Sequence, residues 1–237
     1  MPDQADTQIH TPQAPPRCPA GTDCPNLEAL DELRTEVAAL TEQVHTDTLT
    51  GIANFRHFRQ VLDQEMERTR RTGQATALIM VDLDFFKKVN DTWGHEVGNQ
   101  ALMQTAKLLT QATRRLDTPC RYGGEEFAIV LPSTELITAI QVAERLRSMI
   151  EGTPLIVGEK SLPLTASLGV DTFRTLPHAS TEETAEDFIK RTDEQLYRAK
   201  HEGRNRVCHG ITPIADKEAN VSAEEKDALF GLFGNDD

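Results

Sequence analysis

A short aliphatic segment that ends in two carboxylates is the feature that most limits what this chain can fold into. The segment runs from Ala77 to Val81 and is followed by Asp82, Leu83 and Asp84. Because it is short, aliphatic and closed by polar residues, it predicts a buried β-strand that presents acids at its carboxyl end. The other elements of the domain are therefore expected to be arranged around this strand.

A second apolar segment, residues 120–131, is interrupted by the glycine pair at positions 123 and 124. It predicts a hairpin in which the paired glycines supply the positive φ angles that a two-residue turn needs. If the hairpin lies beside the first strand, Asp82 faces Glu125 and Glu126 at its tip. Converging carboxylates repel one another unless a cation lies between them, and hard oxygen ligands suit Mg²⁺, which usually also takes substrate phosphates.

Helical and strand patterns alternate over the rest of the central part. We expect helices from about residue 55 to Arg71, from Ala101 to Leu116, from its cap Ser133 to Ile150, and from Thr184 to His201 with Gly203 ending it. Further strands are expected from Leu162 to Phe173 and around Val207, with a loop or short turn at residues 90–94. This mixture predicts an α+β sheet that helices cover on at least one face.

The segments on either side differ from this domain in composition. Residues 1–25 are rich in proline and predict a disordered leader. Residues 26–46 predict a coiled-coil stalk, because β-branched and leucine side chains alternate at spacings of three and four and favour a parallel two-stranded pairing: Leu30, Leu33, Val37, Leu40 and Val44. A helix packed on its own domain is the alternative. A stalk this short is only marginally stable alone, and its stability is therefore expected to depend on a partner.

The acidic tail at residues 210–237 is expected to be flexible, to cover the domain or to act as a docking peptide. The net charge of −13 argues against nucleic acid or an anionic membrane as the main partner. No apolar run approaches the length of a membrane span and no signal-peptide core is seen, so we expect a cytoplasmic protein. Its four cysteines are expected to be free thiols.

Several blocks of residues occur in order between positions 45 and 209: Asp47-Thr-Leu-Thr-Gly-Ile-Ala-Asn54, Asp82-Leu-Asp-Phe-Phe-Lys87-Lys-Val-Asn90, Gly94-His95-Glu-Val-Gly98, Arg121-Tyr-Gly-Gly-Glu-Glu-Phe127, Ser167-Leu-Gly-Val170, Asp193-Glu-Gln-Leu-Tyr197-Arg-Ala-Lys200 and Gly203-Arg204-Asn205. Together they resemble GGDEF-domain diguanylate cyclases. The resemblance implies a palm-like α+β domain over residues 47–209, related to nucleotidyl cyclases, with a central and mainly antiparallel sheet. It also implies that two GTP condense to cyclic di-GMP and two pyrophosphates between two domains that face each other, which the stalk would bring together as a homodimer.

The same resemblance implies a metal site and a phosphate site. Asp82, Glu125 and the backbone carbonyl of Leu83 would bind Mg²⁺ (or Mn²⁺), two ions per GTP, and Glu126 would be a further ligand or the catalytic base. Phosphate contacts would come from Lys87, Lys200 and Arg204. Salt bridges for the acids and solvated positions for the cations are the alternatives.

Base recognition and the pocket walls are also implied. Asn90 would contact the guanine edge, and Asn99 stands where the family usually has an aspartate. An amide offers one acceptor and two donors where a carboxylate accepts from both N1–H and N2–H, so a relaxed base choice and hybrid dinucleotides are an alternative. The remaining substrate contacts are two aromatic wall residues, a minor nucleotide contact and two glycines that let the backbone approach phosphate: Phe85, Phe86, His95, Gly123 and Gly124.

Arg114-Arg-Leu-Asp117 matches the inhibitory Arg-x-x-Asp site of the family, with Arg145 on the next helix as a second-domain contact. Product feedback by cyclic di-GMP is the hypothesis, and an ordinary helix-end charge pair is the alternative. A catalytically silent receptor for cyclic di-GMP is the competing function. We also expect a regulatory protein to bind the stalk or the tail and promote the paired state.

Overall fold

The computed structural model describes residues 27–174 and 183–210, and within helix α1 (Leu27–His45) it describes the side chains of residues 29–37 and 45. The leader, nearly all of the tail, Cys18 and Cys24 lie outside these residues. The chain divides into two compact units, residues 1–46 and 47–237. In the first unit, α1 exposes Leu30, Leu33 and Val37 on the single chain. Pairing of this helix with a second copy stays a prediction.

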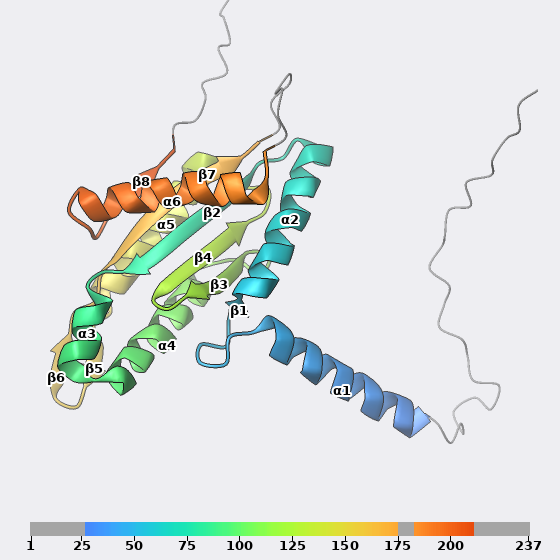
Figure 1. Ribbon diagram of the computed structural model, residues 1–237, viewed down its shortest axis with the longest axis horizontal. Coiled ribbons are helices and arrows are strands. Elements are labelled where there is room, and N and C mark those ends of the chain that lie inside the picture. Colours follow the sequence, from blue (N-terminus) through green and yellow to red (C-terminus); the bar gives the residue numbers. More distant parts are fainter. Residues whose placement is uncertain (1–26, 175–182, 211–237) are drawn as a thin grey trace, which may run out of the picture. The chain divides into compact units, whose positions relative to one another are not determined.

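The second unit is built on a six-stranded sheet in the order β1-β3-β4-β2-β7-β8 (Figure 1). Its strands are β1 (Ala53–Asn54), β2 (Thr76–Leu83), β3 (Thr118–Gly123), β4 (Glu126–Leu131), β7 (Ala166–Phe173) and β8 (Val207–His209). The four central strands are antiparallel neighbours, and only the edge strands β1 and β8 pair in parallel. The predicted α+β fold with a mainly antiparallel sheet is confirmed.

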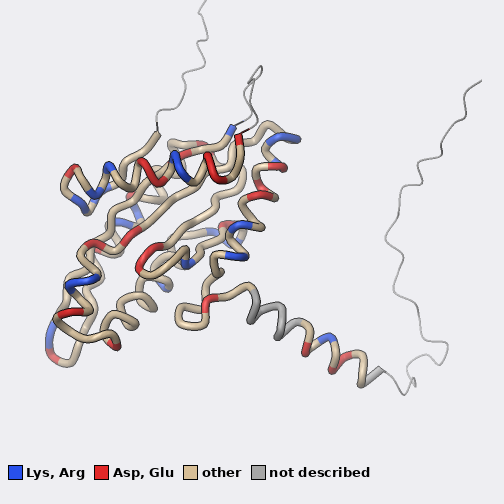
Figure 2. The backbone as a smooth tube through the Cα atoms, in the orientation of Figure 1, with Lys and Arg blue, Asp and Glu red and all other residues tan. Residues whose placement is uncertain are grey.

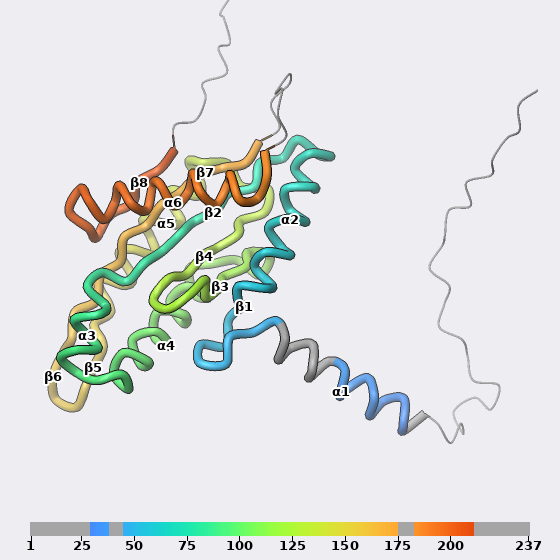
Figure 3. The backbone as a smooth tube through the Cα atoms, viewed as in Figure 1, coloured from blue at the N-terminus to red at the C-terminus, as the bar shows by residue number. Residues whose placement is uncertain are grey.

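Helices cover both faces of this sheet. On one face lie α2 (Phe55–Thr72) and α6 (Ala185–His201); on the other lie α3 (Phe86–Trp93), α4 (His95–Ala112) and α5 (Leu136–Gly152). Figure 3 traces the chain from β2 through α3 and α4 to β3. No helix in the described ranges is both long and apolar enough to cross a membrane.

Strand β2 shows why the core has two halves. All of its residues are buried, and its side chains alternate between the faces. Ile79 and Val81 pack with α4 and α5, whereas Leu78 and Met80 pack with α2 and α6. By the same alternation, Asp82 lies on the face that carries α2 and α6. The acid at the end of the strand therefore points toward α6.

Two predictions for the segment between β2 and β3 were wrong. Residues 90–93 belong to α3 rather than to a loop or short turn, because Phe86 and Val89 bury that helix against the core. Helix α4 begins at His95 and ends at Ala112, four residues before the predicted end, and Leu116 is 72% exposed.

Two further predictions, for Ser133 and Leu162, were wrong. Ser133 does not cap α5; it has φ +47° and its hydroxyl bonds Gln74, so the helix begins after Glu135. Leu162 belongs to β6 (Lys160–Leu162), which forms a separate hairpin with β5 (Leu155–Val157), and the long strand starts only at Ala166. By contrast, the predicted start of α6 is confirmed, since Thr184 forms a capping box with Asp187.

Candidate active site

Two acids meet at one end of the sheet. Asp82 of β2 is in register with Glu126 of β4, and on its other side with Ser167 of β7. Figure 2 shows the acidic residues of the β3–β4 hairpin at this place. The short buried strand and the glycine hairpin thus bring Asp82 and Glu126 to neighbouring positions, as the sequence predicts.

The turn of this hairpin differs from the prediction. Its two residues are Gly124 and Glu125, and only Gly124 has a positive φ, of +33°. Gly123 is the last residue of β3 and follows a shift in register after Arg121. Because of this extra residue, Gly123 rather than Tyr122 pairs with Glu126. Glu125 lies in the turn, where its carbonyl accepts a hydrogen bond from the backbone N–H of Leu83 at 3.4 Å.

Lys200 of α6 forms a salt bridge with Asp82, one of the two acids. Its Nζ lies 2.7 Å from Oδ2 of Asp82. Burial raises the pKa of Asp82, Lys200 opposes that shift, and the charges of Glu125 and Asp84 add to it. Burial also raises the pKa of Glu126, and the charge of Asp82 raises it further. The carboxylates are therefore closer together than their charges favour.

These residues fit a divalent cation by their chemistry, since they supply hard oxygen donors whose mutual repulsion a cation would relieve. Of the two or three acids expected here, Asp82 and Glu126 lie at neighbouring positions, and the charge of Glu125 also acts on Asp82. Within the described ranges, no three His, Cys, Asp or Glu side chains are already spaced to hold an ion. Asp82 is instead paired with Lys200, and the ligand set stays a prediction.

The predicted phosphate contacts lie around the same strand end. Lys200 bonds Asp82, and the guanidinium carbon of Arg204 lies 4.7 Å from the ring centroid of Phe85. Phe85 is 62% exposed, whereas Phe86 is buried in the core, so only the first ring can act as a pocket wall. Lys87 is exposed in the first turn of α3.

The predicted base contacts meet where α3 joins α4. A Cβ on Gly98 would lie only 1.9 Å from Oδ1 of Asn90, so the missing side chain makes room for that amide. Asn99 follows directly and is half-buried, and His95 is exposed at the start of α4. Gly98 thus sets the position of Asn90 beside the helix that carries Asn99.

Arg121 ties the hairpin to the turn at residues 47–51. Its Nη1 donates to both carboxylate oxygens of Asp47 at 3.2 Å, and its Nε and Nη2 donate to the carbonyl of Gly124. The backbone N–H of Thr50 donates to Asp47 as well. Asp47 and Arg121 were named from the sequence only as parts of motifs, and no contact between them was predicted. Opposite charges next to two turns were the one sequence feature that could have indicated this ion pair.

Asp84 is a buried hydrogen-bond centre that sequence reasoning missed. Its carboxylate accepts from the hydroxyls of Thr165 and Ser167 at 2.8 and 2.7 Å, and from the backbone N–H of Asn205 at 3.0 Å. These three donors come from two separate segments, the start of β7 and the turn after α6. The second carboxylate after β2 therefore organises the backbone around the site.

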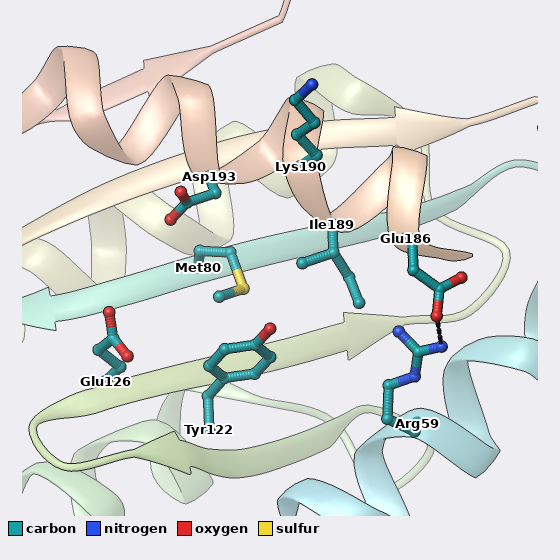
Figure 4. Close-up of a pocket in the computed structure, with 8 residues that line it drawn as sticks. All are labelled: Arg59, Met80, Tyr122, Glu126, Glu186, Ile189, Lys190 and Asp193. Atoms are coloured by element: carbon teal, nitrogen blue, oxygen red, sulfur yellow. Dashed lines mark hydrogen bonds and ion pairs between the residues drawn. The ribbon is translucent and has the colours of Figure 1, made fainter. Parts of the chain in front are cut away.

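A pocket of about 400 Å³ opens beside Glu126 on the face of α2 and α6 (Figure 4). Tyr122, Met80 and Ile189 supply its apolar part, and Asp193 faces Glu126 across it. Burial raises the pKa of Tyr122, and the charge of Glu126 raises it further. No sequence motif indicated this pocket, because its lining comes from five different elements.

The predicted inhibitory residues meet at the end of α4. The backbone N–H of Arg114 donates to Oδ2 of Asp117 at 2.7 Å, and the N–H of Asp117 donates to the carbonyl of Arg114 at 3.0 Å. Arg145 of α5 donates to the carbonyl of Ala112. The structure thus brings Arg145 to the Arg-x-x-Asp turn, while its role in inhibition stays a prediction.

Comparisons with known proteins match most of the chain. Residues 44–206 match the sequence model of the family described as "Diguanylate cyclase, GGDEF domain". The response regulator PleD of Caulobacter vibrioides is 40% identical over 179 residues, which cover 75% of this chain and 38% of PleD. The chain therefore spans well under two thirds of that relative.

Two solved structures are similar in fold. Diguanylate cyclase SiaD of Pseudomonas aeruginosa, crystallised with its activator SiaC, aligns with a TM-score of 0.68 and 38% identity over 77% of this chain and 68% of SiaD. The coiled coil and GGDEF domain of DgcB from Caulobacter crescentus, in complex with c-di-GMP, aligns with a TM-score of 0.70 and 27% identity over 77% of this chain and 94% of DgcB.

Proposed function

The chain belongs to the GGDEF-domain family of diguanylate cyclases, and from this premise we propose that it condenses two GTP into cyclic di-GMP with release of two pyrophosphates. The observation that carries the proposal is the acid pair Asp82 and Glu126, which is held in register beside the turn that contains Glu125, with Lys200 bonded to Asp82. Oxygen ligands next to cationic side chains suit a nucleoside triphosphate with its metal ions.

The metal site is proposed to use the carboxylates of Asp82 and Glu125 and the backbone carbonyl of Leu83, with Glu126 as a further ligand or as the base. Two Mg²⁺ or Mn²⁺ ions per GTP fit this oxygen-rich donor set. When bound, they neutralise the triphosphate, improve pyrophosphate as a leaving group and lower the pKa of the attacking hydroxyl.

The chain's own residues then bind and orient the nucleotide. Lys200, Arg204 and Lys87 contact its phosphates, Phe85 forms a wall, and Asn90 and Asn99 contact the base. Gly123 and Gly124 let the backbone approach the phosphates, and His95 is a minor contact. In each half of the reaction, the 3′-oxygen of one GTP bonds the α-phosphorus of the other, pyrophosphate leaves, and a glutamate of the hairpin accepts the hydroxyl proton.

Because each domain holds one GTP, the reaction needs two copies that face each other. The exposed apolar residues of α1 support a homodimer through a coiled-coil stalk. The structure of SiaD contains an activator protein, which supports a regulatory partner for this chain as well. Arg114, Asp117 and Arg145 are proposed to bind cyclic di-GMP as an inhibitor, and their meeting at the end of α4 supports one common site.

Incubation with GTP and Mg²⁺, with the product identified by mass spectrometry, tests the proposal. We expect cyclic di-GMP from the wild type and a loss of at least about 100-fold for Asp82→Asn, because removing a group from the transition-state site commonly costs that much. A wild type that binds cyclic di-GMP but makes none would support the silent receptor instead.

A cyclase of relaxed base specificity is the second candidate, and Asn99 is the observation that favours it. Its amide cannot accept both guanine donors as a carboxylate does. Reaction with equal GTP and ATP should therefore yield hybrid dinucleotides, and Asn99→Asp should suppress them. Pure cyclic di-GMP from both proteins would exclude this candidate.

A further inference from the structure

The turn after α6, residues 203–206, holds two consecutive non-glycine residues in the left-handed region. Arg204 has φ +62° and Asn205 has φ +46°. Asparagine tolerates this conformation, but for arginine it is unfavourable, because the Cβ crowds the following carbonyl oxygen. The turn therefore keeps this shape only because its surroundings hold it.

The loop after β2 holds the turn from one side. Oδ2 of Asp84 accepts the backbone N–H of Asn205 at 3.0 Å, and the ring of Phe85 lies under the guanidinium of Arg204 at 4.7 Å. Two adjacent residues of one loop thus contact two adjacent residues of the other. This places the Arg204 side chain over an exposed ring next to the acids.

Helix α5 holds the turn from the other side through the amide of Asn205. Arg147 Nη1 donates to Asn205 Oδ1 at 3.1 Å, and Asn205 Nδ2 donates to Glu151 Oε1 at 2.7 Å. Arg147 Nη1 also donates to Glu151 Oε2 at 2.8 Å, so the three side chains close a ring of hydrogen bonds. Arg147 is only 19% exposed in this position.

We propose that Arg147 and Glu151 are positioning residues for the triphosphate, which act through Asn205 by fixing the backbone that presents Arg204. This rests on the proposed function, because Arg204 matters here as a phosphate contact. Neither residue is among the proposed substrate contacts, and none of the sequence motifs includes them. A guanidinium held in one direction loses less rotational freedom when it binds phosphate than a free one does.

A purely structural ion network on α5 would affect stability but not nucleotide binding. The variant Arg147→Ala therefore distinguishes a positioning role from a purely structural one. We expect the KM for GTP to rise about fivefold with kcat changed less than twofold, since one lost hydrogen bond corresponds to about that factor and acts on ground state and transition state alike. The Kd of the unreactive analogue α,β-methylene-GTP with Mg²⁺ should rise by the same factor.

Asn205→Gly provides a second variant, because glycine keeps the backbone shape while losing both side-chain bonds. It should repeat the effect on KM. The matched control is Arg71→Ala, which removes another Arg–Glu pair four residues apart, that with Glu67 on α2. This control should leave both KM and the analogue Kd unchanged.

A double-mutant cycle with Arg204→Ala gives the decisive result. If Arg147 acts through Arg204, adding Arg147→Ala to Arg204→Ala raises KM and the analogue Kd no further. An equal rise in both backgrounds, or a loss of stability with KM unchanged, would overturn the inference. If the wild type binds the analogue but forms no product, only the proposed function is refuted. The positioning role can then still be tested, by measuring the Kd of the analogue for every variant of the cycle. A wild type that does not bind the analogue overturns both.

Discussion

Nζ of Lys200 lies 2.7 Å from Oδ2 of Asp82, so α6 supplies a cation to the carboxylate that ends β2. The side chain of Asp82 is 11% exposed and that of Lys200 is 31% exposed. A largely buried carboxylate beside Glu126 depends on that positive charge. Lys200 is thus a structural partner of the acids as well as a proposed phosphate contact.

Lys200→Met tests this double role in the absence of nucleotide. We expect the free energy of unfolding to fall by about 1–3 kcal/mol in buffer with a chelator, because the buried acceptor loses its charged donor. Added Mg²⁺ should restore part of the loss, since a bound cation stabilises the folded state. Urea unfolding with and without Mg²⁺ measures both. The control is Lys190→Met, an exposed lysine of the same helix; equal stability of the two variants would contradict the expectation.

Gly98→Ala separates nucleotide recognition from stability. The new Cβ would lie 1.9 Å from Oδ1 of Asn90, so the amide must rotate away. Alanine favours a helix over glycine by about 1 kcal/mol, which offsets the crowding. We therefore expect nearly unchanged thermal unfolding with a KM for GTP raised about tenfold, as one lost base contact implies. Gly152→Ala, whose Cβ meets open space, is the control. A normal KM for Gly98→Ala would remove Asn90 from the site.

The two halves of the acid pair could be predicted because local patterns fix where each strand ends. An aliphatic run sets the end of β2 and a glycine turn sets the start of β4, so Asp82 and Glu126 become neighbours once these two strands pair. Helix α3 was missed, because Asn90 and its neighbour favour loops, whereas packing of Phe86 against the core decides for helix.

The contacts around Asp84 could not be predicted from sequence. Asp84 and Asn205 are 121 residues apart, and their hydrogen bond exists only after β2, β7 and α6 have packed together. The meeting of Arg145 with the end of α4 has the same origin, because it depends on how two helices lie on one sheet face. Motifs identify which residues carry chemistry, and packing decides which residues position them.

Gly169→Ala should destabilise the domain strongly. A Cβ at this position would lie 2.3 Å from the backbone N of Leu196 and 2.4 Å from the carbonyl O of Thr192, so helix α6 would have to move off β7. Backbone atoms cannot rotate away as a side chain can, and we expect a loss of about 3 kcal/mol or more. Urea unfolding followed by circular dichroism measures it, again against Gly152→Ala. An unchanged midpoint would mean that α6 does not approach β7 as closely as described.

The Asp47–Arg121 contact predicts how stability depends on pH. Partial burial would raise the pKa of Asp47, but hydrogen bonds from Thr50 and the guanidinium of Arg121 together hold it below its ordinary value. A carboxyl with a lowered folded pKa stabilises the protein above its unfolded pKa, near 3.9, and this contribution is lost as the pH falls through the folded value. Asp47→Asn should therefore cost about 1 kcal/mol at pH 7.

The difference between wild type and Asp47→Asn should stay constant from pH 7 to about 5 and shrink below about pH 4, as the wild-type carboxyl takes up its proton. Urea midpoints measured across this range follow the change. In an Arg121→Met background the cost of Asp47→Asn at pH 7 should be smaller, because the guanidinium that favours the charged carboxyl is gone. If the stability difference between wild type and Asp47→Asn stayed the same below about pH 4, the neutral carboxyl of Asp47 would stabilise the protein as much as the charged one. The prediction that the negative charge of Asp47 stabilises the hairpin turn would then be wrong.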